Sequence, residues 1–168
     1  MNTVHVAFLG MDSDLALDVW ANRAAACLSN SKIIHCEVIL PRRGEAMSIM
    51  ANGKVFIHNK KFSRVDWEFR SVRVTRAQED ALYAFAASAV DRPFNWWGYY
   101  LLPLGGVDGD KTSYFCSELC AHALQSMGLF PRLVPHKTTP GGLMAAMSQS
   151  DTCVKTGHPT RMYNDLSL

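Results

Sequence analysis

One cysteine of this sequence stands where thiol chemistry could use it. Cys116 opens the segment 115–127, in which apolar residues recur at helical spacing, so we expect it in the first turn of a helix. The free N–H groups of a helix N-terminus carry partial positive charge, which favours a thiolate and stabilises the oxyanion formed when a carbonyl is attacked. The alternative is that Cys116 shares a helix face with Cys120 and simply packs in the core.

His35 is the candidate base for this nucleophile. It lies in the β-rich run 32–40, where strand alternation places His35, Glu37 and Ile39 on one face. A carboxylate on the same face can hold the imidazole in one tautomer, as a catalytic base requires. A solvent-facing polar pair on an edge strand is the alternative interpretation.

A metal site is the other chemistry that the cysteines suggest. Cys116 and Cys120, one helical turn apart, could join a histidine around zinc. The sequence lacks the paired Cys-x-x-Cys knuckles of structural zinc, and His122 falls on a different side of the helix from the two cysteines. We therefore expect no metal and no cofactor.

The elements that must position these residues alternate between strands and helices. Residues 4–9 predict a buried strand, and a helix capped by Asp12 or Ser13 should follow to about residue 29. Further β segments at 32–40, 46–50 and 54–57 predict an antiparallel meander, and residues 67–74 predict a further strand of the sheet with one wet face. A capping box at 75–78 should start a helix that Pro93 stops, and residues 95–110 should form an aromatic, glycine-rich connection. A short helix at 143–147 precedes an expected surface tail, 148–168.

Composition predicts one globular α+β domain over residues 1–168. The chain is 48% hydrophobic and 19% charged, and its net charge of +2 does not call for a nucleic-acid partner. No apolar run reaches the roughly 18 residues of a spanning helix, so we expect at most a peripheral membrane contact. No export signal is visible at the N-terminus. The odd, irregularly spaced cysteines favour a reducing, cytoplasmic compartment; they are Cys27, Cys36, Cys116, Cys120 and Cys153.

The order of these motifs resembles a known superfamily. A strand with His-x-Glu, a β-meander, a helix, an aromatic segment and then Phe-Cys-Ser-Glu-Leu at 115–119 is similar to the circularly permuted branch of the NlpC-type papain-like proteins. That branch includes YiiX-like proteins and the lecithin:retinol acyltransferase group, with members in phages and large DNA viruses. The resemblance covers about residues 1–145 and is strongest at 34–40 and 114–124.

The resemblance implies a circularly permuted papain-like fold, in which an antiparallel meander or small barrel packs against helices. It implies a thiol hydrolase, a peptidase or amidase, in which Cys116 attacks an amide or ester and His35 serves as base. The third member would be a polar residue on the next strand, Ser48, but we favour Glu37 because a carboxylate stabilises imidazolium better than a hydroxyl does. If of viral origin, such a protein would work in the host cytoplasm or the virion.

Three further residues are substrate-binding candidates through the same resemblance. Glu118 belongs to the Cys-Ser-Glu signature, although a helix-capping role is an equal alternative. Trp97 lies in the segment 94–102, which resembles the aromatic-Asp-x-x-Gly segment of the family but carries Asn95 in place of aspartate, and Tyr114 immediately precedes the signature. This aromatic cluster could line a groove or only cover the sheet.

The family's chemistry leaves the substrate open among peptide, peptidoglycan and acyl-lipid classes. Two alternatives to hydrolysis remain. A thiol acyltransferase would pass the acyl group to an amine or alcohol on a lipid substrate. A virion or host-factor binding module would keep the fold without turnover.

Overall fold

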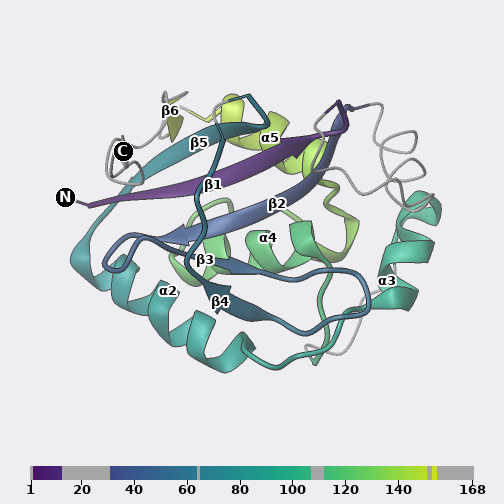
Figure 1. Cartoon of the computed structure of the whole chain (residues 1–168), viewed down its shortest axis with the longest axis horizontal. Coiled ribbons are helices and arrows are strands. Elements are labelled where there is room, and N and C mark those ends of the chain that lie inside the picture. The colour runs from purple at the N-terminus through teal and green to yellow at the C-terminus, as the bar shows by residue number, and fades with distance from the viewer. Residues whose placement is uncertain (1, 13–30, 64, 107–111, 151–152, 155–168) are drawn as a thin grey trace, which may run out of the picture.

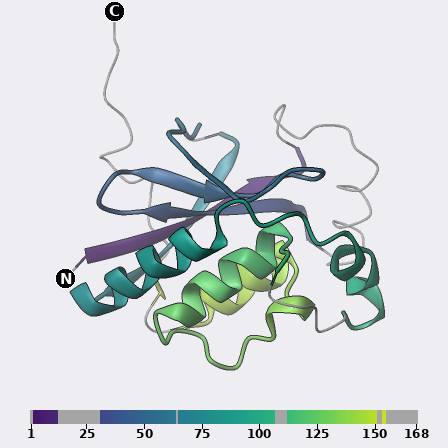
Figure 2. The same cartoon turned by 90° about the horizontal axis from the view of Figure 1, so that it is seen from below.

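The computed structural model describes residues 2–12, 31–63, 65–106, 112–150 and 153–154. Its described part is α+β: an antiparallel sheet carries helices on one face, as Figure 2 shows. The sheet has the strand order β4-β3-β2-β1-β5-β6. The strands are β1 (Asn2–Gly10), β2 (Ile33–Leu40), β3 (Glu45–Ser48), β4 (Phe56–His58), β5 (Trp67–Val74) and β6 (Cys153–Val154).

The helices are short, and three of them are capped by side chains that the sequence places just before them. They are α2 (Arg76–Ala89), α3 (Trp96–Leu101), α4 (Cys116–Ser126) and α5 (Pro140–Ser148), with 3₁₀ turns η1 (Leu102–Leu104) and η2 (Pro135–Lys137). Thr75 and Gln78 form the capping box of α2, Asn95 accepts from the N–H of Gly98 at 2.8 Å, and Thr139 accepts from Gly142 at 3.0 Å. Each cap satisfies N–H groups that would otherwise lack a partner.

β2 divides its side chains between two different environments. Cys36, Val38 and Leu40 face the main core, which α4 covers from behind β2 in Figure 1. Ile39 belongs to a smaller apolar cluster on the opposite face, together with Trp67. Successive side chains from Cys36 to Leu40 therefore alternate between the two faces, and this alternation breaks at Ile33 and Ile34, where the register of β2 shifts.

Two irregularities of β2 open the end that carries His35. Leu9 pairs with His35 but Gly10 pairs with Ile33, so the register shifts by one residue at this end. On the other side, β3 pairs with β2 only from Val38 to Leu40. The segment of β2 from Ile33 to Glu37 thus has no β3 partner, and this edge is where α4 begins.

The α+β class is confirmed, as are strands at 4–9, 32–40 and 67–74 and helices at the Thr75 and Cys116 starts. The meander expected over 32–57 is confirmed as β2, β3 and β4, and the further strand β5 crosses the sheet to pair with β1. The wet face expected for β5 is wrong in part, because Arg70 and Ser71 are buried. Arg70 donates to the hydroxyl of Ser148 at 2.8 Å, which lets its charged group lie under α5.

Other boundaries differ because tertiary contacts override local signals. The 95–110 connection contains α3, since Asn95 supplies a cap that propensity alone does not reveal. The expected strand start at Lys54 is wrong because Lys54 instead bridges Pro93, and β4 begins at Phe56. Cys153–Val154 pairs with β5 rather than lying in surface coil. The helix expected to residue 29 lies outside the described residues, as does Cys27.

Candidate active site

α4 places Cys116 at its first residue. Phe115 is the extended N-cap, and the first helical hydrogen bond runs from the N–H of Leu119 to the carbonyl of Phe115 at 2.9 Å. The N–H groups of residues 116–118 have no carbonyl acceptor within the helix. Cys116 therefore lies at the positive end of the α4 dipole, with 6% of its surface exposed.

The sulfur of Cys116 reaches the open edge of β2. Cys36 contacts it twice there, through its backbone N–H and through its thiol, and both contacts lower the pKa of Cys116. Burial raises the pKa of Cys36 itself well above its usual value. The thiol of Cys36 therefore stays protonated and donates a hydrogen bond to the sulfur of Cys116. Sequence reasoning did not single out Cys36 as part of the site.

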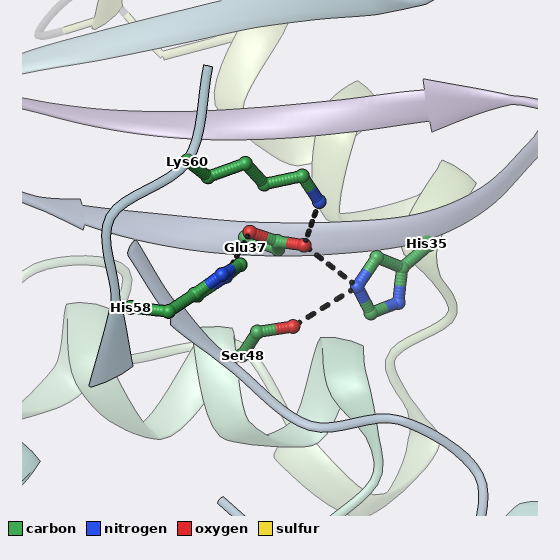
Figure 3. A network of polar contacts seen from close by, with 5 residues as sticks. All are labelled: His35, Glu37, Ser48, His58 and Lys60. Atoms are coloured by element: carbon green, nitrogen blue, oxygen red, sulfur yellow. Dashed lines mark hydrogen bonds and ion pairs between the residues drawn. The ribbon is translucent and has the colours of Figure 1, made fainter. Parts of the chain in front are cut away.

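His35 occupies the same open end of β2 and is held by two side chains. Its Nε2 lies 3.3 Å from Oε1 of Glu37 and 3.2 Å from Oγ of Ser48, as Figure 3 shows. Both candidates for the orienting residue therefore contact the same ring nitrogen. With Nε2 engaged by these two groups, Nδ1 is the ring atom left for the hydrogen bond to Cys116.

The charges of these three side chains stabilise one another. Burial disfavours the charged ring of His35, but hydrogen bonds and charge interactions with Cys116 and Glu37 outweigh it and raise its pKa to about 10. Burial likewise opposes ionisation of Glu37, yet His35 and Lys60 lower its pKa to about 2. The hydrogen bond from Cys36 and the neighbouring His35 keep the pKa of Cys116 well below its usual value in spite of burial. The raised pKa of His35 and the lowered pKa of Cys116 both favour the thiolate–imidazolium form of the pair.

Two residues that the sequence pattern did not indicate complete the surroundings of Glu37. The Nζ of Lys60 lies 2.6 Å from Oε1 of Glu37, and Nε2 of His58 lies 3.4 Å from Oε2 (Figure 3). Glu37 itself is 1% exposed. No local motif could have identified Lys60 or His58, because they follow β3 in the chain and meet β2 only through the folded sheet.

Glu118 and Asn95 hold the start of α4 in place next to Cys116. Oε2 of Glu118 accepts from the backbone N–H of Phe115 at 3.3 Å and from the amide of Asn95 at 3.2 Å. Glu118 is 4% exposed. These contacts agree with the capping alternative and tie the start of α3 to the start of α4.

The remaining two substrate-binding candidates lie in different surroundings from His35. The side chain of Tyr114 is buried between the rings of Phe85 and His122, at centroid distances of 6.2 and 5.6 Å, and lines a surface pocket with them. That pocket does not include Cys116. Trp97 is 79% exposed on α3.

Tyr99, also on α3, is an aromatic residue of this segment that interacts electrostatically with Cys116. Burial and, next, the charge of Cys116 raise the pKa of Tyr99, and its ring packs against Phe115 at a centroid distance of 6.1 Å. The sequence places the aromatic segment shortly before Cys116 but does not distinguish Tyr99 from Trp97. Exposure and ring contacts distinguish them.

Two comparisons with known proteins identify no relative of this chain. Neither a scan against protein-family models nor a search of curated proteins gives a match to the chain. Within the described ranges, no three or more His, Cys, Asp or Glu side chains are grouped so that they could hold a metal ion. The described helices also include none with the length and apolar character needed to cross a bilayer.

Proposed function

We propose that this chain is a thiol hydrolase that cleaves an amide or ester through an acyl-enzyme on Cys116. The observation that carries the proposal is the contact of Cys116, the first residue of α4, with His35, whose Nε2 lies 3.3 Å from Oε1 of the buried Glu37. A low thiol pKa alone is compatible with a redox or structural cysteine. A proton donor fixed by a buried carboxylate and located beside a helix N-terminus supports acyl transfer.

The proposed reaction has two steps. The thiolate of Cys116 attacks the carbonyl carbon, and backbone N–H groups in the first turn of α4 stabilise the oxyanion. The imidazolium of His35 then gives its proton to the leaving nitrogen or oxygen, the C–N or C–O bond breaks, and the amine or alcohol departs while the acyl group stays on Cys116 as a thioester. In the second step neutral His35 takes a proton from water, whose oxygen attacks the thioester, and Cys116 leaves as thiolate while the acid is released.

The proposed fold family is the circularly permuted papain-like group. Its support is the order of parts: a strand bearing histidine precedes, in the chain, a helix that begins with cysteine, and that helix packs on the antiparallel sheet. The proposal keeps peptide, peptidoglycan and acyl-lipid substrates as candidates. It also keeps a reducing, cytoplasmic setting, because an oxidised Cys116 could not act as nucleophile.

Acylation by a small activated ester tests the proposal without knowledge of the substrate. Protein incubated with 4-nitrophenyl acetate should gain one acetyl group on Cys116, located by peptide mapping, and Cys116→Ala should gain none at that peptide. The adduct should then decay with release of acetate. A protein that never acylates at Cys116 would contradict the proposal and favour a binding module.

The same adduct distinguishes hydrolysis from acyl transfer. Decay in buffer alone, unchanged by millimolar amine or alcohol, supports a hydrolase. Faster decay with formation of the amide or ester supports an acyltransferase. Decay in His35→Ala should be much slower than in the native protein, because general-base catalysis typically contributes about 10²–10⁴-fold.

A further inference from the structure

Lys60 and His35 share a single oxygen atom. The Nζ of Lys60 lies 2.6 Å from Oε1 of Glu37, and Nε2 of His35 lies 3.3 Å from the same Oε1. Figure 3 shows the two side chains reaching this oxygen, while His58 approaches Oε2. Two cations that bond one atom at these distances lie within about 6 Å of each other, close enough for each to affect the protonation of the other.

The ammonium of Lys60 is held in place by aromatic rings. It lies 4.1 Å from the ring centroid of Trp67 and 5.3 Å from that of Phe62, both of which are buried on this face of the sheet. The side chain of Lys60 is 25% exposed. Partial desolvation strengthens the electrostatic interactions of this ammonium, and the cation–π contacts hold it in place better than a surface lysine.

The ring of Trp67 also connects Lys60 to His35. The indole meets the imidazole edge to face, with centroids 6.2 Å apart. Glu37 and Lys60 thus lie on the side of His35 that carries Nε2. This side is the one opposite to the nitrogen left for Cys116.

The position of Lys60 has two electrostatic consequences. It keeps the buried carboxylate of Glu37 ionised, and its hydrogen bond fixes Oε1 toward His35. It also opposes a second positive charge beside it, so it limits the stabilisation that Glu37 gives to imidazolium. The reaction needs such a balance, because His35 must release a proton in the first step and accept one in the second.

We propose that Lys60 is a positioning residue of the reaction, which orients the Glu37 carboxylate and adjusts how tightly His35 holds its proton. The role of Lys60 in the reaction rests on the proposed function, whereas the effect of Lys60 on the protonation of His35 does not. Among the described residues, the other titratable groups that contact His35 or Glu37 are Cys116 at the start of α4 and His58 on β4, and Cys116 in turn interacts with Cys36 on β2 and Tyr99 on α3.

The protonation of His35 can be measured without any substrate. Nitrogen-15 NMR of the imidazoles is recorded against pH in Cys116→Ala, where the charge of Cys116 no longer raises the pKa of His35. Adding Lys60→Met should raise that pKa by about one, because a nearby positive charge is lost. Lys60→Arg should restore the parent curve, and Lys61→Met, the same change at an exposed neighbour, should leave it unaltered.

The catalytic consequence is read from decay of the acetylated protein. Deacylation needs neutral His35, so in Lys60→Met its rate profile should move to higher pH by about one unit and the rate below the limb should fall about tenfold. Lys60→Gln, which keeps a hydrogen-bond donor but no charge, should behave similarly. Thermal melting of each variant establishes that it is folded.

The outcomes separate the two proposals. A His35 titration that does not move in folded Lys60→Met or Lys60→Gln overturns the role of Lys60, whether or not Cys116 acylates. A titration that moves as expected in a protein that never acylates leaves the electrostatic role intact and removes the hydrolase. A loss of activity in Lys60→Met with no change in either pH profile would mean a purely structural contact, which also overturns the inference.

Discussion

Replacement of Glu37 by glutamine tests which residue stabilises the imidazolium. In the structure, Oε1 accepts from both Lys60 and His35, whereas Oε2 faces His58. The glutamine oxygen should take the Oε1 position, because its NH₂ group would otherwise point at the ammonium of Lys60. The tautomer of His35 is then kept, and the variant loses only the negative charge.

The magnitude follows from that loss. An opposite charge within about 4–6 Å changes a pKa by about one to three, so Glu37→Gln should lower the pKa of His35 from about 10 by that amount. A charged hydrogen bond contributes about 1.5–3 kcal/mol and a neutral one about 0.5–1.5, so the imidazolium that forms as water attacks is less stabilised. The deacylation rate at its high-pH plateau should fall about tenfold, while the limb of the profile moves to lower pH with the pKa of His35. That is far less than the ~10⁴-fold loss expected when an amide inverts the tautomer of a catalytic histidine.

Ser48→Ala is the matched control, because Ser48 bonds the same Nε2 without a charge. It should lower the pKa of His35 by less than about one, since a neutral hydrogen bond is worth only about 0.5–1.5 kcal/mol. The assay is nitrogen-15 NMR titration of His35, assigned by its absence in His35→Gln, with thermal melting to verify folding. A His35 titration unchanged in Glu37→Gln, or moved further by Ser48→Ala, would refute the assignment of Glu37.

Four other outcomes are expected. Brief iodoacetamide treatment at about pH 6–7 should label Cys116 first, because burial raises the pKa of both Cys36 and Cys153; peptide maps dominated by either of those would contradict the site. Cys36→Ala should slow alkylation of Cys116 severalfold near pH 6, since the Cys36 thiol is the largest cause of the low pKa of Cys116, and an unchanged rate would exclude that contribution. Glu118→Gln should lower the free energy of unfolding in urea by about 1–3 kcal/mol, the cost of leaving buried partners poorly satisfied, whereas a neutral change would mean that the cap is dispensable. Folding lowers the pKa of Glu37 from 4.5 to about 2, so ionised Glu37 stabilises the fold above pH 4.5, and this contribution is lost as the pH falls through 2. Between pH 4.5 and 2 the melting temperature should therefore drop less in Glu37→Gln than in the native protein.

Local signals in the sequence determined where the candidate nucleophile, Cys116, lies. Apolar periodicity and the Gly128 stop define the helix that Cys116 begins, and alternation within β2 puts His35 and Glu37 on one face. These features depend on residues a few positions apart, so composition and spacing are enough to predict them. The same is true of the Thr75 capping box.

Only the tertiary structure decided how the site is assembled. The register shift and the early end of β3 open one edge of β2, and through that edge Cys116 meets Cys36 and His35. Strand pairing brings Lys60 to the oxygen of Glu37 that His35 already uses. Such contacts join residues from about 20 to 80 positions apart, and their formation depends on which strands pair and which rings pack, a choice that local propensity does not make.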